Sequence, residues 1–464
     1  MTKGHQFHPT ILREYDIRGI VPETLSADDV RVTGRVFGTM LKEKGGRTAA
    51  VGYDGRLSSP ELEAAMVEGL AASGVAVTRI GLGPSPMLYF AAETLPADAG
   101  VMITGSHNPP DYNGIKMIVG GKPFFADDIR QLGARAEAGN YADGNGDISE
   151  KAVLADYVAR LLVDFEASDG APAKVAWDAG NGAAGDALKM LTEGLPGSHV
   201  LLNEEIDGTF PAHHPDPTVE SNLAQLKDTV ASQGCDLGVA FDGDGDRIGV
   251  IDAQGRVLWG DQLLVILAAE VLKDHPGATI IADVKASTVF FNEIARMGGK
   301  PLMWKTGHSH IKNKMVETGA PLAGEMSAHI FFKHRYYGFD DALYVAVRLI
   351  SALNRSGESL AQVIDRLPVM MNTPELRFEC PEDRKFVVVD EVRSRLRNVD
   401  DIKVNEIDGV RVETEDGWWL LRASNTQAVL VARCESVSVE GLEMLKLQLS
   451  AQLTESGIEP PDLG

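Results

Sequence analysis

The sequence predicts a multidomain α/β protein, and three observations lead to this prediction. The chain has 464 residues, enough for about three domains of ordinary size. From residue 26 onward, short apolar runs typical of strands alternate with helical stretches, which is the order of parallel sheets covered by helices. Hydrophobic residues make up 44% of the chain and charged residues 24%, so the chain can bury extensive cores.

Local signals place the elements of the first hundred residues. Ser26 is a suitable N-cap, and the apolar residues that follow it fall near one helical face. Ser59 and Pro60 fit an N-cap and a first helical position. Strands are expected at residues 48–53, 75–80 and 100–103, with helices at 62–70 and 87–94 between them. This order implies a largely parallel sheet with helices on both faces.

Three predicted strands end in an aspartate before a polar turn. The aspartates are Asp54, Asp178 and Asp283. We interpret the recurrence as three structurally similar α/β units. Because ligands bind at the carboxyl ends of strands in α/β sheets, the turns after these residues are candidate site loops.

The last hundred residues have a different pattern. Strand-like runs lie at residues 404–412, 418–421 and 429–434, and helices are expected at 390–397 and 439–453. This arrangement indicates a smaller α+β domain. We therefore expect four domains, at residues 1–152, 153–256, 257–367 and 368–464.

Charge and cysteine content exclude several classes of function. The chain has 44 Lys and Arg residues against 67 Asp and Glu, a formal charge of −23 that disfavours nucleic acid and anionic membranes as partners. An anionic ligand therefore needs a local basic pocket or a bound cation. The three cysteines lie far apart, no apolar run reaches the about 18 residues of a membrane span, and the first residues lack a signal-peptide core. We expect a cytoplasmic protein.

The most specific local signal is an acidic loop between two apolar strands. Asp242, Asp244 and Asp246 alternate with glycines between strands at residues 237–241 and 248–251. Oxygen ligands on a tightly bending backbone suit Mg²⁺. A calcium loop would need Gly in place of Arg247 and Glu in place of Ala253. The other alternative is a solvated acidic turn, but three aspartates packed between buried strands would repel one another without a cation.

A second signal follows the strand at residues 100–103. Ser106, preceded by Gly105, is placed at the end of that strand, on the side of the sheet where ligands bind. A serine hydrolase elbow would need Gly at residue 108, where the chain has Asn. Taken alone, the segment is typical of a capped turn, because Ser, Asn and Pro all favour turns.

The motifs taken together are far more specific than any one alone. Residues 104–109, 242–247, 324–329 and 422–426, together with 13–19 and 306–309, resemble the α-D-phosphohexomutase family, specifically the bacterial phosphomannomutases/phosphoglucomutases. The resemblance covers essentially the whole chain. It implies four domains around a central cleft, three of them similar mixed-sheet α/β domains and the last an α+β domain.

The resemblance also implies a reaction. Phosphorylated Ser106 gives its phosphoryl group to O1 or O6 of a hexose phosphate, and the hexose 1,6-bisphosphate turns end for end before returning the other group. The net isomerisation is reversible and moves phosphate between C1 and C6 of mannose and glucose phosphates. Mg²⁺, held by a phosphoserine oxygen of Ser106 and by Asp242, Asp244 and Asp246, would offset the charge on the transferring group.

Further residues receive roles from the same resemblance. Arg247 would brace the phosphate, and Arg18, His107 and Lys116 would add positive potential. His308 and Lys116 are both candidate general bases, and the sequence leaves open which one serves each half-reaction. Glu325 and Ser327 would bond O3 and O4 of the sugar. The expected substrate-binding residues are Tyr15, Arg18, Lys285, Glu325, Ser327, His329, Arg422, Ser424, Asn425 and Thr426.

Two other functions are weighed against this one. A phosphoglucosamine mutase of the same family is the closest alternative, and a metal-dependent sugar-binding module without catalysis is a more distant one. The chain departs from the family pattern at Ala328, where Gly is usual, and at His334, where an acidic residue is common. We expect a monomer in carbohydrate metabolism or polysaccharide biosynthesis, with a C-terminal domain that opens and closes over the cleft.

Overall fold

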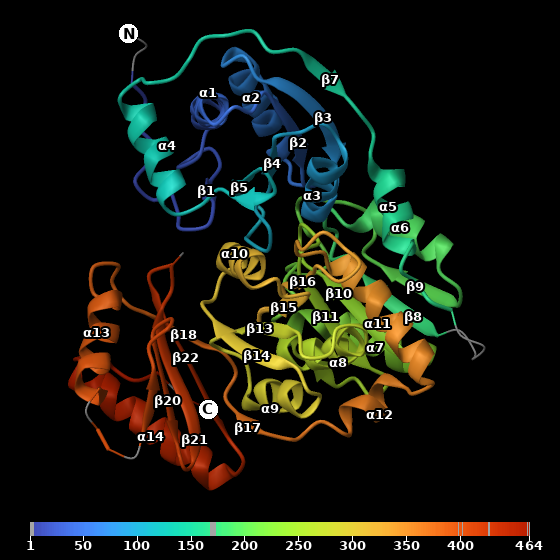
Figure 1. Ribbon diagram of the computed structural model, residues 1–464, viewed down its shortest axis with the longest axis vertical. Helices are drawn as coiled ribbons and strands as arrows, with labels where there is room; N and C mark the ends of the chain where they lie inside the picture. The colour runs from blue at the N-terminus through green and yellow to red at the C-terminus, as the bar shows by residue number, and fades with distance from the viewer. Residues whose placement is uncertain are drawn as a thin grey trace.

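The computed structural model describes residues 4–167, 173–397, 399–400, 402–425, 427–461 and 463. These residues form four β-sheets, one for each predicted domain, although the second sheet ends with β12 (Val257–Leu258), two residues past the predicted boundary at residue 256. In Figure 1 the chain runs from the first domain at the top, through the second at the right and the third in the centre, to the C-terminal domain at the lower left. No helix in this described part of the chain has the length and apolar character of a membrane span.

The first domain contains a mixed sheet. Its elements are β1 (Ile17–Ile20), α1 (Ala27–Glu43), β2 (Thr48–Tyr53), α2 (Ser59–Ala72), β3 (Ala76–Leu82), α3 (Ser85–Thr94), β4 (Ala99–Ile103), β5 (Tyr112–Val119), β6 (Lys122–Pro123), α4 (Asp127–Glu137) and β7 (Ile148–Glu150). The strand order is β1-β5-β4-β2-β3-β7, with β6 beside β5. Strand β2 is parallel to β3 and β4, whereas β5 is antiparallel to β4.

The starts of two helices test the capping predictions. At α1 the prediction is confirmed: Ser26 Oγ accepts the Asp29 N–H at 3.3 Å, and the Asp29 carboxylate accepts the Ser26 N–H at 2.8 Å. At α2 it is wrong by one residue, because Ser58 occupies the N-cap position and Ser59 is already helical. The Ser59 hydroxyl donates to Asp54 Oδ1 at 2.5 Å.

The second and third domains repeat the central part of the first. The second contains α5 (Leu154–Leu162), β8 (Lys174–Asp178), α6 (Gly185–Gly194), β9 (Ser198–Leu202), the 3₁₀ helix η1 (Glu220–Leu223), α7 (Ala224–Gln233), β10 (Leu237–Phe241), β11 (Ile248–Asp252) and β12 (Val257–Leu258). The third contains α8 (Gly260–Asp274), β13 (Thr279–Asp283), α9 (Thr288–Arg296), β14 (Lys300–Trp304), α10 (His308–Thr318), β15 (Leu322–Gly324), β16 (Ile330–Phe332), α11 (Ala342–Ser356) and α12 (Leu360–Ile364).

In all three domains a central strand lies between two parallel neighbours. One of those neighbours also pairs with the antiparallel strand that follows it in the chain. The central strands are β2, β8 and β13, and the antiparallel pairs are β4–β5, β10–β11 and β15–β16. The prediction of three similar units is therefore confirmed. Ser106, the acidic loop and Glu325 all lie in the connection between the two strands of this antiparallel pair.

The C-terminal domain has an antiparallel sheet covered by two long helices. It comprises β17 (Met371–Asn372), β18 (Leu376–Glu379), α13 (Lys385–Leu396), β19 (Lys403–Asn405), β20 (Val410–Thr414), β21 (Gly417–Ala423), β22 (Val429–Ser436) and α14 (Val439–Glu455). The α+β prediction is confirmed, but the single strand expected at 404–412 is wrong. Strands β19 and β20 pair antiparallel with each other across a turn, and Gly409 (φ +82°) lies in that turn.

The first three domains share a hydrophobic core, whereas the C-terminal domain has a separate one. One core joins α3 of the first domain with most of the second and third domains, so these three domains are packed together. The C-terminal domain has its own core around Trp419 and Leu445. A small cluster of Val284, Trp418 and Leu420 connects it to the third domain.

Candidate active site

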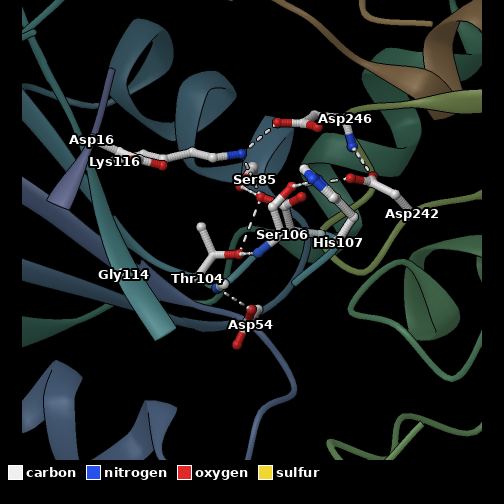
Figure 2. Close-up of polar contacts among 12 residues, drawn as sticks. Asp16, Asp54, Ser85, Thr104, Ser106, His107, Gly114, Lys116, Asp242 and Asp246 are labelled. Atoms are coloured by element: carbon white, nitrogen blue, oxygen red, sulfur yellow. Dashed lines mark hydrogen bonds and ion pairs between the residues drawn. The ribbon is translucent and has the colours of Figure 1, made fainter. Parts of the chain in front are cut away.

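Ser106 lies in the β4–β5 loop and faces the acidic loop of the second domain (Figure 2). Its Oγ is 3.1 Å from Asp242 Oδ2 and 3.3 Å from His107 Nδ1, and its side chain is almost fully buried. Its backbone has φ +51°, a left-handed conformation that few residues other than glycine adopt. The Ser106 N–H donates to Thr104 Oγ1 at 2.9 Å, which helps to fix this conformation.

The acidic loop joins β10 to β11 and brings its three carboxylates together. Asp242, Asp244 and Asp246 are fully buried, and one oxygen of each lies within 4.8 Å of the others. Asp242 Oδ1 accepts the N–H groups of Asp246 and Arg247, both at 3.1 Å. Gly245, at φ +73°, allows the tight bend that these bonds require.

Groups of the first domain hold Asp244 from the other side. Its Oδ2 accepts bonds from the Ser85 hydroxyl, from Thr104 Oγ1 at 3.1 Å and from Lys116 Nζ at 2.7 Å. Lys116 Nζ also lies 2.6 Å from Asp246 Oδ2. Burial alone would lower the pKa of Lys116, but the charges of Asp244 and Asp246 outweigh burial and raise it well above its ordinary value. Lys116 is therefore a fixed positive charge beside the loop.

The three carboxylates fit a hard divalent cation. Among the described residues, Asp244 Oδ1 and Asp246 Oδ1 are buried oxygens that no protein group hydrogen-bonds. Burial, together with the neighbouring charges of Asp246 and Asp244, raises the pKa of Asp242 well above its ordinary value. Lys116 and Arg247 thus leave the three carboxylates short of positive charge, and two acceptor oxygens are open to a ligand.

A second cluster of possible ligands, Asp246, His329 and Asp340, does not fit a cation as well. Arg247 Nε donates to His329 Nε2 at 2.9 Å. Because an arginine has no acceptor, His329 Nε2 must carry the lone pair, and the ring proton lies on Nδ1. His329 Nδ1 is 3.0 Å from Asp340 Oδ2, so the ring orients Arg247 and does not offer Nδ1 to a metal.

His308 begins helix α10 and lies next to His329. The two rings stack with centroids 5.6 Å apart, and the Tyr15 ring contacts the His308 ring edge-on at 5.9 Å. Burial, with the nearby charge of Lys312, lowers the pKa of His308 well below its ordinary value. His308 is therefore neutral in this arrangement, whereas Lys116 is protonated.

The β15–β16 loop carries the predicted sugar-binding residues. Glu325 is buried, and its Oε1 accepts the N–H of Gly307 at 2.6 Å, whereas Ser327 is partly exposed. Ala328, where the family pattern has Gly, adopts φ +67°. This left-handed conformation favours glycine, so the alanine strains the loop. His334, the other departure, donates from Nε2 to Asp274 Oδ2 at 2.9 Å.

The predicted phosphate-binding residues of the C-terminal domain lie where three domains meet. Arg422 Nε donates to Asp408 Oδ2 at 3.1 Å. Asn425 Nδ2 donates to the Tyr15 hydroxyl at 2.7 Å, which itself donates to the Thr306 carbonyl at 3.0 Å. Thr426 lies outside the described residues. A cavity of about 370 Å³ adjoins this contact and is lined by residues of the first, third and fourth domains.

Several predicted residues already have protein partners. Lys285 Nζ is 2.7 Å from Glu375 Oε2 of the C-terminal domain. Arg18 bonds Asn108 of the Ser106 loop and Asp16. Ser424 Oγ accepts the Gln427 N–H at 3.2 Å. The geometry thus brings Ser106, His107, Lys116, Arg247 and the acidic loop together, with Arg18 bonded to the Ser106 loop, and the remaining sugar and phosphate residues lie in the third and C-terminal domains apart from Tyr15.

Sequence reasoning missed Ser85, Asp340 and Glu375. Each acts as a partner to a predicted residue: Ser85 to Asp244, Asp340 to His329 and Glu375 to Lys285. Single polar residues in helices and loops carry no local signal of this kind. Ser85, between Pro84 and Pro86 at the end of a strand, is the only one of the three whose surroundings mark a strand-to-helix turn.

Comparison with known proteins gives a family match in every domain. Residues 9–142, 154–255, 259–370 and 375–452 match the models of domains I, II, III and the C-terminal domain of phosphoglucomutase/phosphomannomutase. A Pseudomonas aeruginosa protein named phosphomannomutase/phosphoglucomutase is 44% identical over 444 residues, which cover 96% of this chain and 95% of that protein. A Neisseria meningitidis phosphoglucomutase is 42% identical, covering 95% and 96%.

A crystal structure extends the likeness to the whole fold. The phosphoglucomutase/phosphomannomutase family protein of Burkholderia thailandensis superimposes with a TM-score of 0.91 and 40% identity, over 99% of both chains. Four matching domains in the same order, together with relatives above 40% identity along almost the entire length, leave a single assignment. The chain belongs to the phosphoglucomutase/phosphomannomutase family of the α-D-phosphohexomutases.

Proposed function

We propose that the chain moves a phosphoryl group reversibly between C1 and C6 of glucose and mannose phosphates, with Ser106 as the carrier. The observation that carries the proposal is the 3.1 Å approach of Ser106 Oγ to Asp242, across the boundary between two domains. A strained, buried serine that faces three carboxylates is suited to carrying a phosphoryl group beside a cation. The enzyme is a hexose-phosphate mutase, and hence an isomerase.

The proposed transfer exchanges one P–O bond for another. The bond between phosphorus and Ser106 Oγ breaks, a bond to O1 or O6 of the hexose phosphate forms, and the hydroxyl proton passes to a base. The resulting hexose 1,6-bisphosphate turns over and returns its other phosphoryl group to Ser106 Oγ by the reverse exchange. Such transfers depend mainly on alignment and charge neutralisation.

We propose Mg²⁺ as the cation, held by Asp242, Asp244, Asp246 and an oxygen of the Ser106 phosphate. Bound there, it neutralises charge on the transferring group. Lys116 and Arg247 supply further positive charge on either side of the loop. His107 lies beside Ser106 Oγ, and burial lowers its pKa well below its ordinary value, so it is a neutral hydrogen-bonding group for the phosphate.

The proton and the sugar are handled by the third domain in this proposal. His308, neutral in this arrangement, accepts the hydroxyl proton. Glu325 and Ser327 bond O3 and O4, whose positions are the same in glucose and mannose, so contact there permits both sugars. Lys285, His329, Arg18 and Tyr15 complete the binding of the substrate.

The non-reacting phosphate is assigned to the C-terminal domain. Arg422 offers a guanidinium, and Ser424, Asn425 and Thr426 offer hydroxyl and amide groups within the same loop, a set that suits a dianion. The site uses residues from all four domains of one chain, which supports action as a monomer. The three cysteines, all free and buried, are in keeping with the reducing cytoplasm.

A coupled assay tests the substrate proposal. Wild-type protein and Ser106→Ala are assayed with glucose 1-phosphate, mannose 1-phosphate and glucosamine 1-phosphate, with glucose 1,6-bisphosphate present. We expect turnover of the first two sugars by the wild type and of none by the variant. A rate dominated by glucosamine 1-phosphate would favour the phosphoglucosamine mutase alternative. Unchanged activity of Ser106→Ala would exclude the serine carrier.

A further inference from the structure

Arg56 is a fully buried arginine beneath the Ser106 loop. It follows β2 in the turn that begins at Asp54, one of the three strand-ending aspartates, and its side chain is 1% exposed. Such complete burial of a guanidinium is rare unless every donor finds a partner. The predicted roles described above leave this residue unused.

The donors of Arg56 end almost entirely on the Ser106 loop. Nη2 donates to the carbonyl oxygens of Ser106 at 2.7 Å and Asn108 at 2.6 Å. Nη1 donates to those of Pro109 at 2.5 Å and Tyr112 at 2.9 Å. Nε donates to Asp54 Oδ2 at 3.2 Å, so each nitrogen is used. One side chain thus binds three carbonyls of the loop and a fourth at the first residue of β5, all between residues 106 and 112.

Asp54 and Gly105 complete the arrangement. Asp54 is buried, balances the charge of Arg56 and accepts the Gly105 N–H at 3.1 Å. A Cβ atom on Gly105 would lie 2.4 Å from Arg56 Nε and 2.5 Å from its Cζ. Glycine is therefore required at residue 105 because the guanidinium packs directly against the backbone there.

From these contacts we propose that Arg56 is a positioning residue for phosphoryl transfer. It holds the backbone of Ser106 in its left-handed conformation, so that Oγ stays directed at the acidic loop throughout the catalytic cycle. This inference rests on the proposed function of Ser106.

The chemistry explains why a fixed loop matters. Ser106 Oγ alternates between a neutral hydroxyl and a phosphate dianion, and a loop free to relax would move differently in the two states. Carbonyl oxygens bound to Arg56 are also kept from turning toward the dianion, which they would repel. Since phosphoryl transfer depends on alignment, a small displacement of Oγ lowers the transfer rate far more than it weakens sugar binding.

Substitution of Arg56 by lysine and by methionine distinguishes the effect of its positive charge from that of its hydrogen-bonding geometry. Arg56→Lys keeps a positive charge but cannot reproduce the planar fork, and Arg56→Met removes both. Gly105→Ala retains Arg56 and displaces its guanidinium from the loop. Arg79→Lys is the matched control, because Arg79 pairs with buried Glu63 at 2.6 and 2.9 Å in the same domain, away from the loop. Ser106→Ala is assayed beside them.

Three quantities are measured for each variant: kcat and KM for glucose 1-phosphate with saturating glucose 1,6-bisphosphate, and the melting temperature. A fourth is the rate at which the phosphorylated protein releases phosphate to water without sugar. For Arg56→Met we expect kcat to fall by about 100-fold, with KM within about threefold of wild type. For Arg56→Lys we expect a kcat between those of the wild type and Arg56→Met. The ratio of hydrolysis to transfer rises, because water needs less alignment than a sugar hydroxyl.

Arg79→Lys and Gly105→Ala distinguish a loss of loop positioning from a general loss of stability. Arg79→Lys is expected to lower the melting temperature and to leave kcat and the hydrolysis ratio unchanged. If the Arg56 variants do not fold, Gly105→Ala decides, with the same loss of kcat and rise in hydrolysis expected. Wild-type kcat in Arg56→Met or in folded Gly105→Ala would overturn the inference. A loss of kcat that is proportional to the loss of melting temperature in all variants, Arg79→Lys included, would also overturn it. Phosphate retained by Ser106→Ala would instead refute the proposed function itself.

Discussion

Removal of the Lys116 charge tests the electrostatic balance of the site. In Lys116→Met the apolar stem remains, but Asp244 and Asp246 each lose a bond to Nζ, of 2.7 and 2.6 Å. Breaking a buried ion pair by removal of one partner costs about 3–5 kcal/mol. At roughly 2–4 °C per kcal/mol for domains of 150–250 residues, the melting temperature without metal should fall by about 6–20 °C.

The same variant should respond more strongly to Mg²⁺. A bound cation supplies the charge that the variant lacks, so it should stabilise the variant more than the wild type. Thermal unfolding is followed for both proteins in chelator and in excess Mg²⁺. Lys312→Met is the matched control, because Lys312 is a buried lysine paired with Asp340 at 2.9 Å and does not bond the acidic loop.

For Lys312→Met we expect a lower melting temperature and the same Mg²⁺-induced shift as in the wild type. The reasoning is refuted if Lys116→Met melts like the wild type in chelator, or if its Mg²⁺-induced shift equals that of the wild type. Activity of Lys116→Met should also fall by about 100-fold or more, since a fixed charge beside the transferring group is lost.

The remaining predictions concern the metal, the distal phosphate and pH. Chelation should abolish turnover and added Mg²⁺ should restore it; full activity after exhaustive chelation would contradict the metal site. Arg422→Met should raise KM by about 10- to 100-fold with a smaller change in kcat, and an unchanged KM in steady-state assays would refute its phosphate role. The hydrogen bond that His213 Nε2 donates to Asp178 Oδ2 raises the pKa of His213, so charged His213 stabilises the fold below its ordinary pKa, and this contribution is lost as the pH rises through the raised value. His213→Gln should therefore lower the melting temperature more at about pH 5.5 than at about pH 8.5, and an equal effect at both would contradict this.

Much of the site could be predicted from local sequence. The acidic loop places three carboxylates within five residues, and its chemistry follows from their alternation with glycine. Ser106 could be placed at the end of a strand, but its left-handed backbone and its approach to Asp242 depend on packing between two domains. Its role therefore came from the combination of motifs, and not from the turn alone.

The strand-ending aspartates show where sequence reasoning stopped. The sequence marks the turns after Asp54 and Asp283 as candidate site loops, but it does not indicate that each aspartate accepts an N–H from the loop of the next antiparallel pair, that of Gly105 and that of Met326. These bonds link residues 51 and 43 positions apart. Periodicity predicts strands and helices, but which loops meet depends on the sheet topology.

The expected movement of the C-terminal domain remains a prediction with structural support. That domain has its own core and meets the third domain through the small cluster at Trp418. Polar contacts such as Lys285–Glu375 and Tyr15–Asn425 complete the junction. Scattering curves recorded with and without glucose 1,6-bisphosphate should differ, and identical curves would contradict the movement.

Transfer of labelled phosphate tests the carrier role of Ser106 most directly. The protein is incubated with glucose 1,6-bisphosphate carrying radioactive phosphate, separated from free sugar, and then given unlabelled glucose 6-phosphate. The account predicts one label per chain, located on Ser106 by peptide mapping, absent from Ser106→Ala and passed on to the sugar within a turnover. Label that never enters the wild-type protein, or that stays on Ser106 when the sugar is added, would contradict it.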